Sequence, residues 1–347
     1  MSGSGRASSS GRASGSGVAR RVWVVGLAAA LAIVVVAGVA LCLGDVAVSP
    51  AQIVAALTGN ADRLTSFVIV DLRLPRIVTS IVVGLCLGLS GALFQTIARN
   101  PLASPDIIGV TAGASAAGVI GVVVLGLSGL ALSGVVLLGA IAAAVAIYVL
   151  AWRGGIAGYR FVLIGIGIAA LGTGVVSVVL TRTSITDAQS ALVWLSGSVN
   201  GADWGRFLPL AASAAVFTAA ALVLHGPLSV LELGDDLASG LGVRAERTRA
   251  AAIGIGVVLA AIAVSAAGPV AFVALVSAPI ARRLVGGGAL ALAPSALIGG
   301  LMVLVADVVA QFAVPSLVFP VGVVTGIVGA PYLLWLLTRT NRVGRGG

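Results

Sequence analysis

The sequence contains no lysine, and all 20 basic residues among its 347 are arginine. A phosphate-binding loop of the G-x-x-x-x-G-K-[ST] kind requires a lysine, and so does a Schiff base with an aldehyde cofactor. We therefore expect neither nucleotide hydrolysis nor aldimine chemistry, and no catalytic residue, in this chain. If ATP drives the protein, another subunit binds it.

Histidine and cysteine are almost as scarce, since His225, Cys42 and Cys86 are the whole set. Metal sites built from imidazole and thiolate usually need three or four such ligands. We therefore expect no zinc site, no haem and no disulfide framework, and we predict no metal site and no cofactor. Both cysteines lie in apolar runs, where a small buried hydrophobic side chain is the simplest interpretation.

Charged residues make up only 9% of the chain and hydrophobic residues 59%, which does not suit a water-facing surface. A helix needs about 20 apolar residues to cross about 30 Å of hydrocarbon, so this length holds roughly ten spans. The net charge of +9 comes from arginines scattered between apolar segments, which does not favour nucleic-acid binding. We expect an all-α polytopic membrane protein surrounded by lipid.

The chain begins with a Ser/Gly/Arg-rich segment, residues 1–21, that cannot bury a core and is predicted to be a disordered tail. The next run, 22–43, has full spanning length, and we interpret it as a retained span rather than a cleaved leader. Residues 339–347 form a short basic tail. The other nine predicted spans are 76–98, 106–126, 130–151, 161–181, 207–224, 250–266, 268–284, 293–312 and 319–338.

One apolar stretch, 106–151, is too long for a single span, and Gly126, Gly129 and Gly134 offer a break in it. Close contact between helices is expected elsewhere too, because small residues let membrane helices approach. Gly84 and Gly88 form a G-x-x-x-G pair that suits either packing within the chain, which we favour, or dimerisation.

A second stretch, 250–281, breaks at Gly268-Pro269 if the positive-inside rule is applied. With that hairpin and both termini in the cytoplasm, 15 arginines lie inside and five outside. Without it the division is ten against ten, so the hairpin is preferred. The five arginines predicted outside are Arg63, Arg73, Arg76, Arg182 and Arg206.

Polar groups mark the two ends of the second span. At its outer end Arg73 and Arg76 flank Pro75, and arginines extending to lipid headgroups would explain them without further function. At its inner end Gln95 is expected to make an interhelical hydrogen bond rather than to contact a substrate. The following residues Asn100, Pro101 and Pro105 predict a tight cytoplasmic reversal.

The long cytoplasmic connection at 225–249 allows two short amphipathic helices, about 228–233 and 235–241. A solvated loop is the simpler alternative, but the segment has too many leucines for one, so we expect it to dock on a cytoplasmic partner. Its acidic residues would then face basic residues of that partner. The residues assigned to this surface are Leu228, Leu231, Glu232, Leu233, Gly234, Asp235, Asp236, Leu237, Gly240, Leu241 and Gly242.

Taken in order, these elements resemble the FecCD family, the permeases of ABC importers for iron–siderophore complexes and vitamin B12. Ala278-Pro279, Gln311 and Phe319 depart from the pattern of many members. Of these, the A-P-I-A-R-R sequence at 278–283 and Gln311 most resemble permeases of the ferric enterobactin type. The matching motifs are R-L-P-R at 73–76, R-N-P-L-A-S-P at 99–105, L-G-D-D-L-A-S-G-L-G-V at 233–243, G-P-V-A-F-V-A-L at 268–275, Asp307, P-V-G at 320–322 and G-A-P-Y at 329–332.

The resemblance implies a type II importer permease fold of ten helices over 22–338 in the bacterial inner membrane. It implies a second permease subunit, identical or paralogous, two ATP-binding subunits inside, and an extracytoplasmic siderophore-binding protein outside. Arg73 and Arg76 would dock the binding protein, and the 228–243 helices would couple to the ATPase. The structural or gating candidates are Gln95, Asn100, Pro101, Pro105, Gly268, Pro269, Asp307, Pro320 and Gly322.

Asp307 is the one acid deep within a predicted span, where a carboxylate must be paired, protonated or facing a cavity. In a proton-coupled secondary transporter it would be the relay residue, and this is our alternative function. The resemblance instead implies that it faces the protein interior near an outer helix end. The leading expectation is therefore a permease that translocates ferric siderophore complexes with energy from a separate ATPase.

Overall fold

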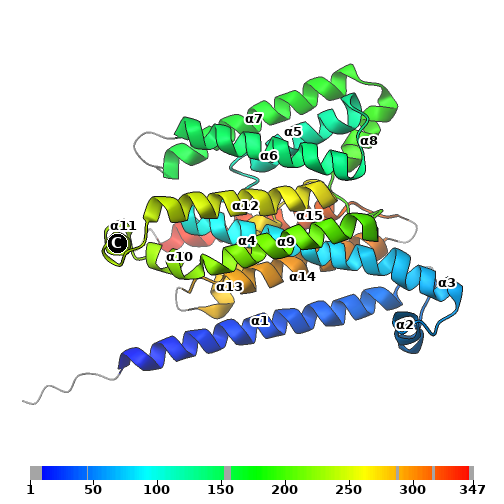
Figure 1. The fold of residues 1–347 in the computed structure, drawn as a ribbon, viewed down its shortest axis with the longest axis horizontal. Coiled ribbons are helices and arrows are strands. Elements are labelled where there is room, and N and C mark those ends of the chain that lie inside the picture. The colour runs from blue at the N-terminus through cyan, green and yellow to red at the C-terminus, as the bar shows by residue number, and fades with distance from the viewer. Residues whose placement is uncertain (1–9, 45, 152–157, 287–288, 315–316, 344–347) are drawn as a thin grey trace, which may run out of the picture.

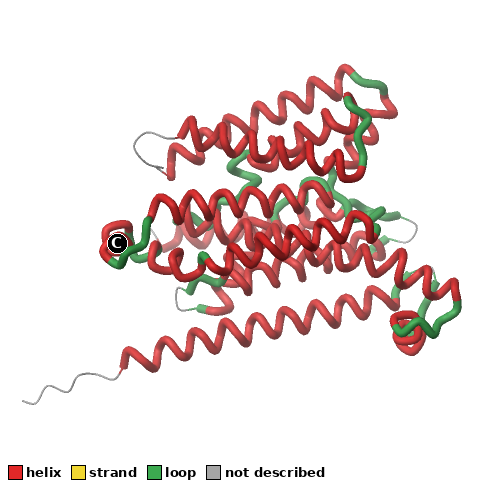
Figure 2. The backbone as a smooth tube through the Cα atoms, viewed as in Figure 1, coloured by secondary structure: helices red, strands yellow, loops and turns green. Residues whose placement is uncertain are grey.

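A computed structural model describes residues 10–44, 46–151, 158–286, 289–314 and 317–343. Within these ranges the chain is helical, with one isolated bridge between Val314 and Leu317 and no strand (Figure 2). The all-α expectation is therefore confirmed.

Each of the ten predicted spans falls on a helix. Seven of the described helices are long and apolar enough to cross a membrane, and the segments 110–124 and 321–335 are shorter apolar helices. The helices are α1 (Ser10–Cys42), α4 (Leu74–Ala98), α5 (Val110–Val119) continued by η2 (Ile120–Val124), α6 (Gly129–Ala151), α7 (Gly158–Arg182), α9 (Trp204–Val223), α12 (Ala245–Ala267), α13 (Val273–Val285), α14 (Leu292–Phe312) and α15 (Val321–Val343).

Both predicted breaks in the long apolar stretches are confirmed. Gly126 and Gly129 have φ angles of 60° and 58° and separate η2 from α6. Gly268, with φ 68°, ends α12, and α13 begins only at Val273. These backbone angles favour glycine, which has no Cβ to clash.

Several short helices at one end of the bundle were not predicted. They are α2 (Pro50–Leu57), α3 (Arg63–Ser66) with η1 (Phe67–Arg73), and α8 (Ile185–Leu195). Side chains of Ser49, Asp62 and Ser184 cap three of them by accepting backbone N–H groups. These capping residues were the sequence signal that could have predicted the short helices, because Ser and Asp at the N-cap accept hydrogen bonds from otherwise unpaired backbone N–H groups.

The ends of the chain differ from the expected boundaries. Helix α1 begins at Ser10, inside the segment predicted to be a tail, and α15 continues to Val343. A helix extends past its apolar part because adding a residue to an existing helix is far easier than starting one. Residues 1–9 and 344–347 of the two predicted tails lie outside the described residues.

The bundle has three layers (Figure 1). Helix α4 lies in the middle layer and packs against α14, α12, α13 and α9. Helices α5 to α8 form a layer on one side, held mainly by α12, and α1 lies on the other side against α14. Helix α4 is buried along most of its length, whereas only 11% of the apolar window of α7 is buried.

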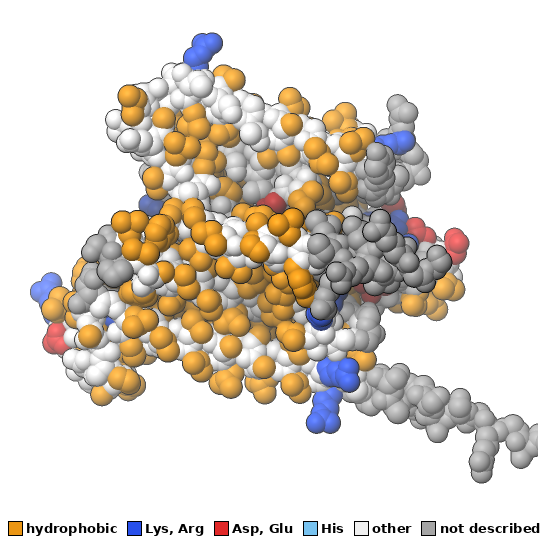
Figure 3. All heavy atoms as spheres, turned by 180° about the vertical axis from the view of Figure 1, so that it is seen from behind, with side chains coloured by type: hydrophobic (Ala, Val, Ile, Leu, Met, Phe, Trp, Pro, Cys, Tyr) orange, Lys and Arg blue, Asp and Glu red, His pale blue; other side chains and the backbone are white. Residues whose placement is uncertain are grey.

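The exposed middle of the bundle is apolar, as a lipid-facing surface requires. Leu31, Leu171 and Val216, from three different helices, are each more than 60% exposed. On the face in Figure 3, hydrophobic side chains cover the middle and charged side chains lie mainly toward the two ends. The end with α10 (His225–Leu231) and α11 (Asp235–Gly240) is called cytoplasmic below, following the arginine distribution, and the end with α2, α3 and α8 is called outer.

Glycines bring α4 into backbone contact with its neighbours. A Cβ at Gly84 would overlap Gly299 of α14, one at Gly88 would overlap Ser295, and one at Gly91 would overlap Ala274 of α13. The G-x-x-x-G pair thus serves packing within the chain, which confirms the preferred interpretation.

Gly84→Ala should therefore destabilise the protein by about 1–3 kcal/mol, because the added methyl group overlaps the backbone of α14. Gly174→Ala on α7 is the matched control, since nothing lies within 4 Å of its Cβ position. Thermal unfolding in detergent measures the difference. Equal melting temperatures for the two variants would contradict the close α4–α14 contact.

Candidate functional site

A buried ion pair joins α14 to the outer end of α4. The Asp307 side chain is 1% exposed and that of Arg76 is 15% exposed. Arg76 Nε donates to both carboxylate oxygens at 3.1 Å, and its Nη2 donates to Oδ1 at 2.9 Å. Gln311, one turn further along α14, donates to Oδ2 at 2.9 Å. Asp307 thus faces the protein interior near the outer helix end, as expected.

Arg76 also reaches the loop between α8 and α9. Its Nη1 donates to Asn200 Oδ1 at 3.3 Å, and its backbone carbonyl accepts a hydrogen bond from Ser80 at 2.9 Å. One guanidinium thus connects three segments that are distant in sequence. Pairing of this kind allows a carboxylate to reside within a membrane protein, where an isolated charge costs several kcal/mol.

Arg73 organises the connection between α1 and α2. Its guanidinium donates to the carbonyl oxygens of Leu41 at 2.7 Å and Val46 at 2.6 Å, and it packs against Gly44. Gly44 has φ 143°, and a side chain there would overlap the guanidinium. Both arginines predicted to dock a binding protein therefore lie at the outer end and have partners within the chain.

Three of the predicted structural residues meet at a second outer junction. A Cβ at Gly268 would overlap the carbonyl oxygen of Trp194, and one at Gly322 would overlap that of Ser196. The backbone of Gly322 also donates to Gly197 at 3.1 Å, and Pro269 lies against the same glycine. This junction links the start of α15 and the α12–α13 turn to the end of α8. Pro320 directly precedes α15.

The cytoplasmic end of α4 carries the other predicted structural residues. Gln95 Nε2 donates to the carbonyl of Leu275 on α13 at 3.0 Å, which confirms the expected interhelical hydrogen bond. Asn100 Oδ1 accepts from the backbone of Leu102 at 2.9 Å and so closes the turn that contains Pro101. Pro105 is buried in the same connection.

Helices α10 and α11 form a small projection at the cytoplasmic end (Figure 1). Leu228 and Leu231 of this segment are buried against the bundle. Leu233, Leu237 and Leu241 point outward and are 61%, 60% and 65% exposed. We call these three residues the leucine patch. The remaining glycines of the predicted surface, Gly234, Gly240 and Gly242, lie at the ends of α11, and two of them have positive φ.

Asp235 fixes the projection to two spanning helices. Its Oδ1 accepts hydrogen bonds from Arg99, at the end of α4, at 3.1 Å and from Arg249 of α12 at 2.7 Å. The Arg249 hydrogen bond is the main cause that lowers the pKa of Asp235 below its ordinary value of 3.8. The carboxylate is therefore ionised at neutral pH.

A neighbouring group of charged and polar side chains connects the projection to α13. Glu232 lies 3.9 Å from Arg282, which donates to Thr96 of α4 at 2.6 Å. Glu232 and Asp235 were expected to face a partner protein, but they pair within the chain because arginines end the adjacent helices. Asp236 is exposed. In the sequence, Arg99, Arg249 and Arg282 indicated only the topology, through the positive-inside rule, and not these ion pairs.

Comparison with known proteins agrees with this architecture. The model of the FecCD transport family matches residues 30–339. The ferric enterobactin transport system permease protein FepG of Escherichia coli K12 is 39% identical over 309 residues, covering 89% of this chain and 94% of FepG. The iron(3+)-hydroxamate import system permease protein FhuG of Bacillus subtilis 168 is 35% identical over 320 residues, covering 90% and 95%.

A solved structure of a metal-chelate type ABC transporter in an inward-facing conformation has a TM-score of 0.81 to this chain. The two are 28% identical, and the match covers 90% of this chain and 98% of the other. The fold is thus the type II ABC importer permease fold, and the protein is a multi-pass permease subunit in the bacterial cytoplasmic membrane. The chain belongs to the FecCD transport family.

Family membership implies a partner ATPase and a substrate-binding subunit, so the chain itself is not an enzyme. The alternative of a proton-coupled secondary transporter is not favoured. Asp307 is held by Arg76 and Gln311, and a proton relay needs a carboxylate that can exchange its proton.

Asp307→Ala should be strongly destabilising, by about 3–5 kcal/mol, because it leaves the Arg76 charge without its partner. Arg76→Met combined with Asp307→Leu removes both charges and should recover much of that loss. A double-mutant cycle of thermal unfolding measures the coupling. Additive effects of the single changes would contradict the pairing.

Asp235→Asn should increase amide hydrogen exchange in α11, because the two arginines lose their charged partner. The wild type should keep its protection from about pH 8 to about pH 5. A lowered pKa gives a contribution that is complete above pH 3.8 and is lost as the pH falls through the folded value. Loss of α11 protection already near pH 6 would contradict this assignment.

Proposed function

We propose that this permease translocates ferric siderophore complexes, powered by a separate ATPase that binds the leucine patch. Several relatives are named for different Fe³⁺ carriers, including enterobactin, hydroxamate and citrate. These names share an Fe³⁺ chelate as the transported compound, but the chelator differs from one relative to another. The higher identity to FepG favours a ligand of the ferric enterobactin type.

The leucine patch is the observation that carries the coupling role. Its three leucines are exposed, and they lie between the predicted spans 207–224 and 250–266, outside the hydrocarbon. Adjacent exposed apolar side chains in water mark a site of protein interaction. Asp236, exposed on the same short helix, supplies a charge at the rim of that surface.

The ion pairs next to the leucine patch provide a route by which a movement of the ATPase reaches the spanning helices. Asp235 joins α11 to α4 and α12, and Glu232 faces Arg282 of α13. Displacement of α11 by a closing ATPase would therefore pull on the ends of three spanning helices. A coupled transition requires such a contact between the moving partner and the element with two states.

At the outer end we place docking of the extracytoplasmic siderophore-binding protein near Arg73 and Arg76. Both guanidinium groups hold loops that form this surface, and Arg76 keeps 15% of its side chain exposed. An acidic side chain of the binding protein would add to these contacts. The complete importer in this proposal contains a second permease subunit, identical or paralogous, and two ATP-binding subunits.

Uptake of radiolabelled iron by vesicles containing the assembled importer tests the proposal. Ferric enterobactin should be taken up in the presence of ATP and the binding protein, and uptake should survive collapse of the proton gradient. A ferric hydroxamate in place of the catecholate tests the choice of chelator. Uptake that stops with the gradient and ignores ATP would overturn the proposal.

Leu237→Asp should reduce co-purification of the ATPase and iron uptake at least tenfold, because a charge replaces an apolar contact in the middle of the patch. Leu237→Met should retain both activities. Arg247→Gln is a further control, since this residue is exposed at the same end. Wild-type ATPase binding by Leu237→Asp would remove the patch from the coupling role.

A further inference from the structure

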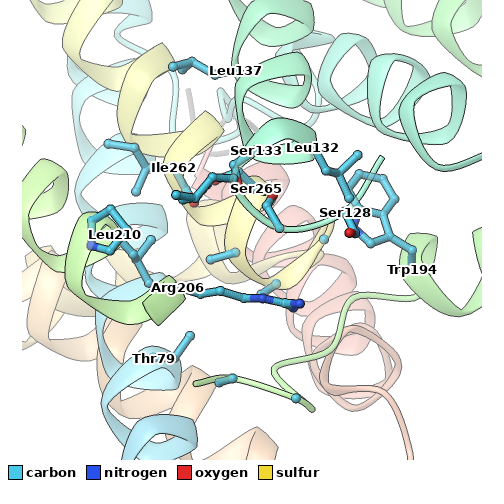
Figure 4. A pocket seen from close by; sticks show the side chains of 18 of the residues that line it. Thr79, Ser128, Leu132, Ser133, Leu137, Trp194, Arg206, Leu210, Ile262 and Ser265 are labelled. Carbon is cyan, nitrogen blue, oxygen red and sulfur yellow. Dashed lines mark hydrogen bonds between the residues drawn. The ribbon is translucent and has the colours of Figure 1, made fainter. Parts of the chain in front are cut away.

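A cavity of about 610 Å³ opens between α6, α9 and α12 in the outer half of the bundle (Figure 4). Helix α12 contributes Val258 and Ile262, α6 contributes Leu132 and Leu137, and α9 contributes Phe217. Helices α6 and α9 both pack on α12, which therefore forms the floor between them. The volume is in the range of small-molecule sites, about 300–1,000 Å³.

The depth of the cavity matches one leaflet of a bilayer. Its lining along α9 runs from Arg206, near the outer end, to Phe217. At 1.5 Å per residue this distance is roughly 16 Å. One leaflet contributes half of the hydrocarbon core of about 30 Å.

The polarity of the lining changes along this depth. The inner part is formed by the apolar side chains of Leu137, Phe217 and Val258. Hydroxyl groups in the middle bind their own helices: Ser133 donates to Gly129, Ser213 to Pro209 and Ser265 to Ile262. They present no unsatisfied donor, so the inner and middle parts suit a hydrocarbon chain.

Two polar groups at the outer part lack such partners. Arg206 extends across the cavity, with Thr79 below it (Figure 4). Arg206 Nε pairs with Asp203 at 3.2 Å, whereas its two terminal nitrogens have no hydrogen-bond partner among the described residues. Thr79 is 4% exposed, and its hydroxyl is also without a partner there.

We propose that this cavity binds a membrane phospholipid, with one acyl chain along α12 and the phosphate at the terminal nitrogens of Arg206. A guanidinium edge is well suited to two parallel hydrogen bonds with phosphate oxygens. An apolar channel of one-leaflet depth with a cation at its outer end matches the chain and headgroup of a phospholipid in the outer leaflet. Nothing in the transport role proposed above requires this site.

Other occupants fit less well. Water would need polar partners throughout the cavity, but the inner lining offers only apolar side chains. A helix of a second permease would bring a width of about 10 Å and would leave the Arg206 charge facing apolar side chains.

Retention of lipid after purification tests the proposal. Wild type, Arg206→Gln and Arg182→Gln are reconstituted into vesicles of phosphatidylethanolamine and phosphatidylglycerol, re-extracted in detergent and weighed by native mass spectrometry. Arg182 is an exposed arginine at the same outer end and outside the cavity, so it is the matched control. Arg206→Gln should retain about tenfold less phospholipid, and Arg182→Gln should behave as wild type.

A second pair of variants tests access to the cavity. Ala266 is exposed and lines the cavity near the outer end of α12, so Ala266→Phe should obstruct it there and release the lipid. Ala251→Phe places the same ring on an exposed position of α12 outside the cavity and should retain the lipid. All variants must elute as single species in gel filtration. Equal retention by Arg206→Gln and wild type, or cross-linking of Ala266→Cys to a second permease subunit, would overturn the proposal.

Discussion

The close approach of α4 to α14 and α13 is the constraint on which both ends of this permease depend. Gly84, Gly88 and Gly91 allow backbone contact through the middle of the bundle. That contact places Arg76 opposite Asp307 at the outer end and Gln95 opposite the Leu275 carbonyl at the inner end. Lipid supplies no hydrophobic drive between helices, so tight packing and a few polar contacts must fix their relative position.

The charges at the two ends have different physical settings. The Arg76–Asp307 pair is buried, and separating it would leave a charge in a medium of low dielectric constant. Asp235 is about half exposed and so is Arg99, which leaves this pair open to water, where ion pairs are weak, whereas the Arg249 side chain is only 16% exposed. The outer pair therefore suits a fixed connection, whereas the exposed Arg99–Asp235 pair can rearrange when a partner moves α11.

The sequence predicted the spans, the two breaks and the Gln95 hydrogen bond, because apolar length, glycine and arginine bias report directly on a bilayer. It did not predict the partners of Arg73, Asp235 and Glu232. Those pairs join residues far apart in the chain, and one sequence contains no information on which arginine meets which acid. The short outer helices were missed because their caps are local signals that apolar runs obscure.

Arginines at the outer end show that one residue type serves different purposes depending on what surrounds it. Arg76 donates to the carboxylate of Asp307 and to the amide oxygen of Asn200, so its charge is balanced within the protein. Arg206 has one nearby carboxylate, and its terminal nitrogens lie at the outer part of the cavity, above an apolar inner lining. The Arg206 side chain is 61% exposed, so its terminal nitrogens are accessible to an anion from the surroundings. In a bilayer the abundant anion at that depth is lipid phosphate, which connects the packing of this permease to the membrane that holds it.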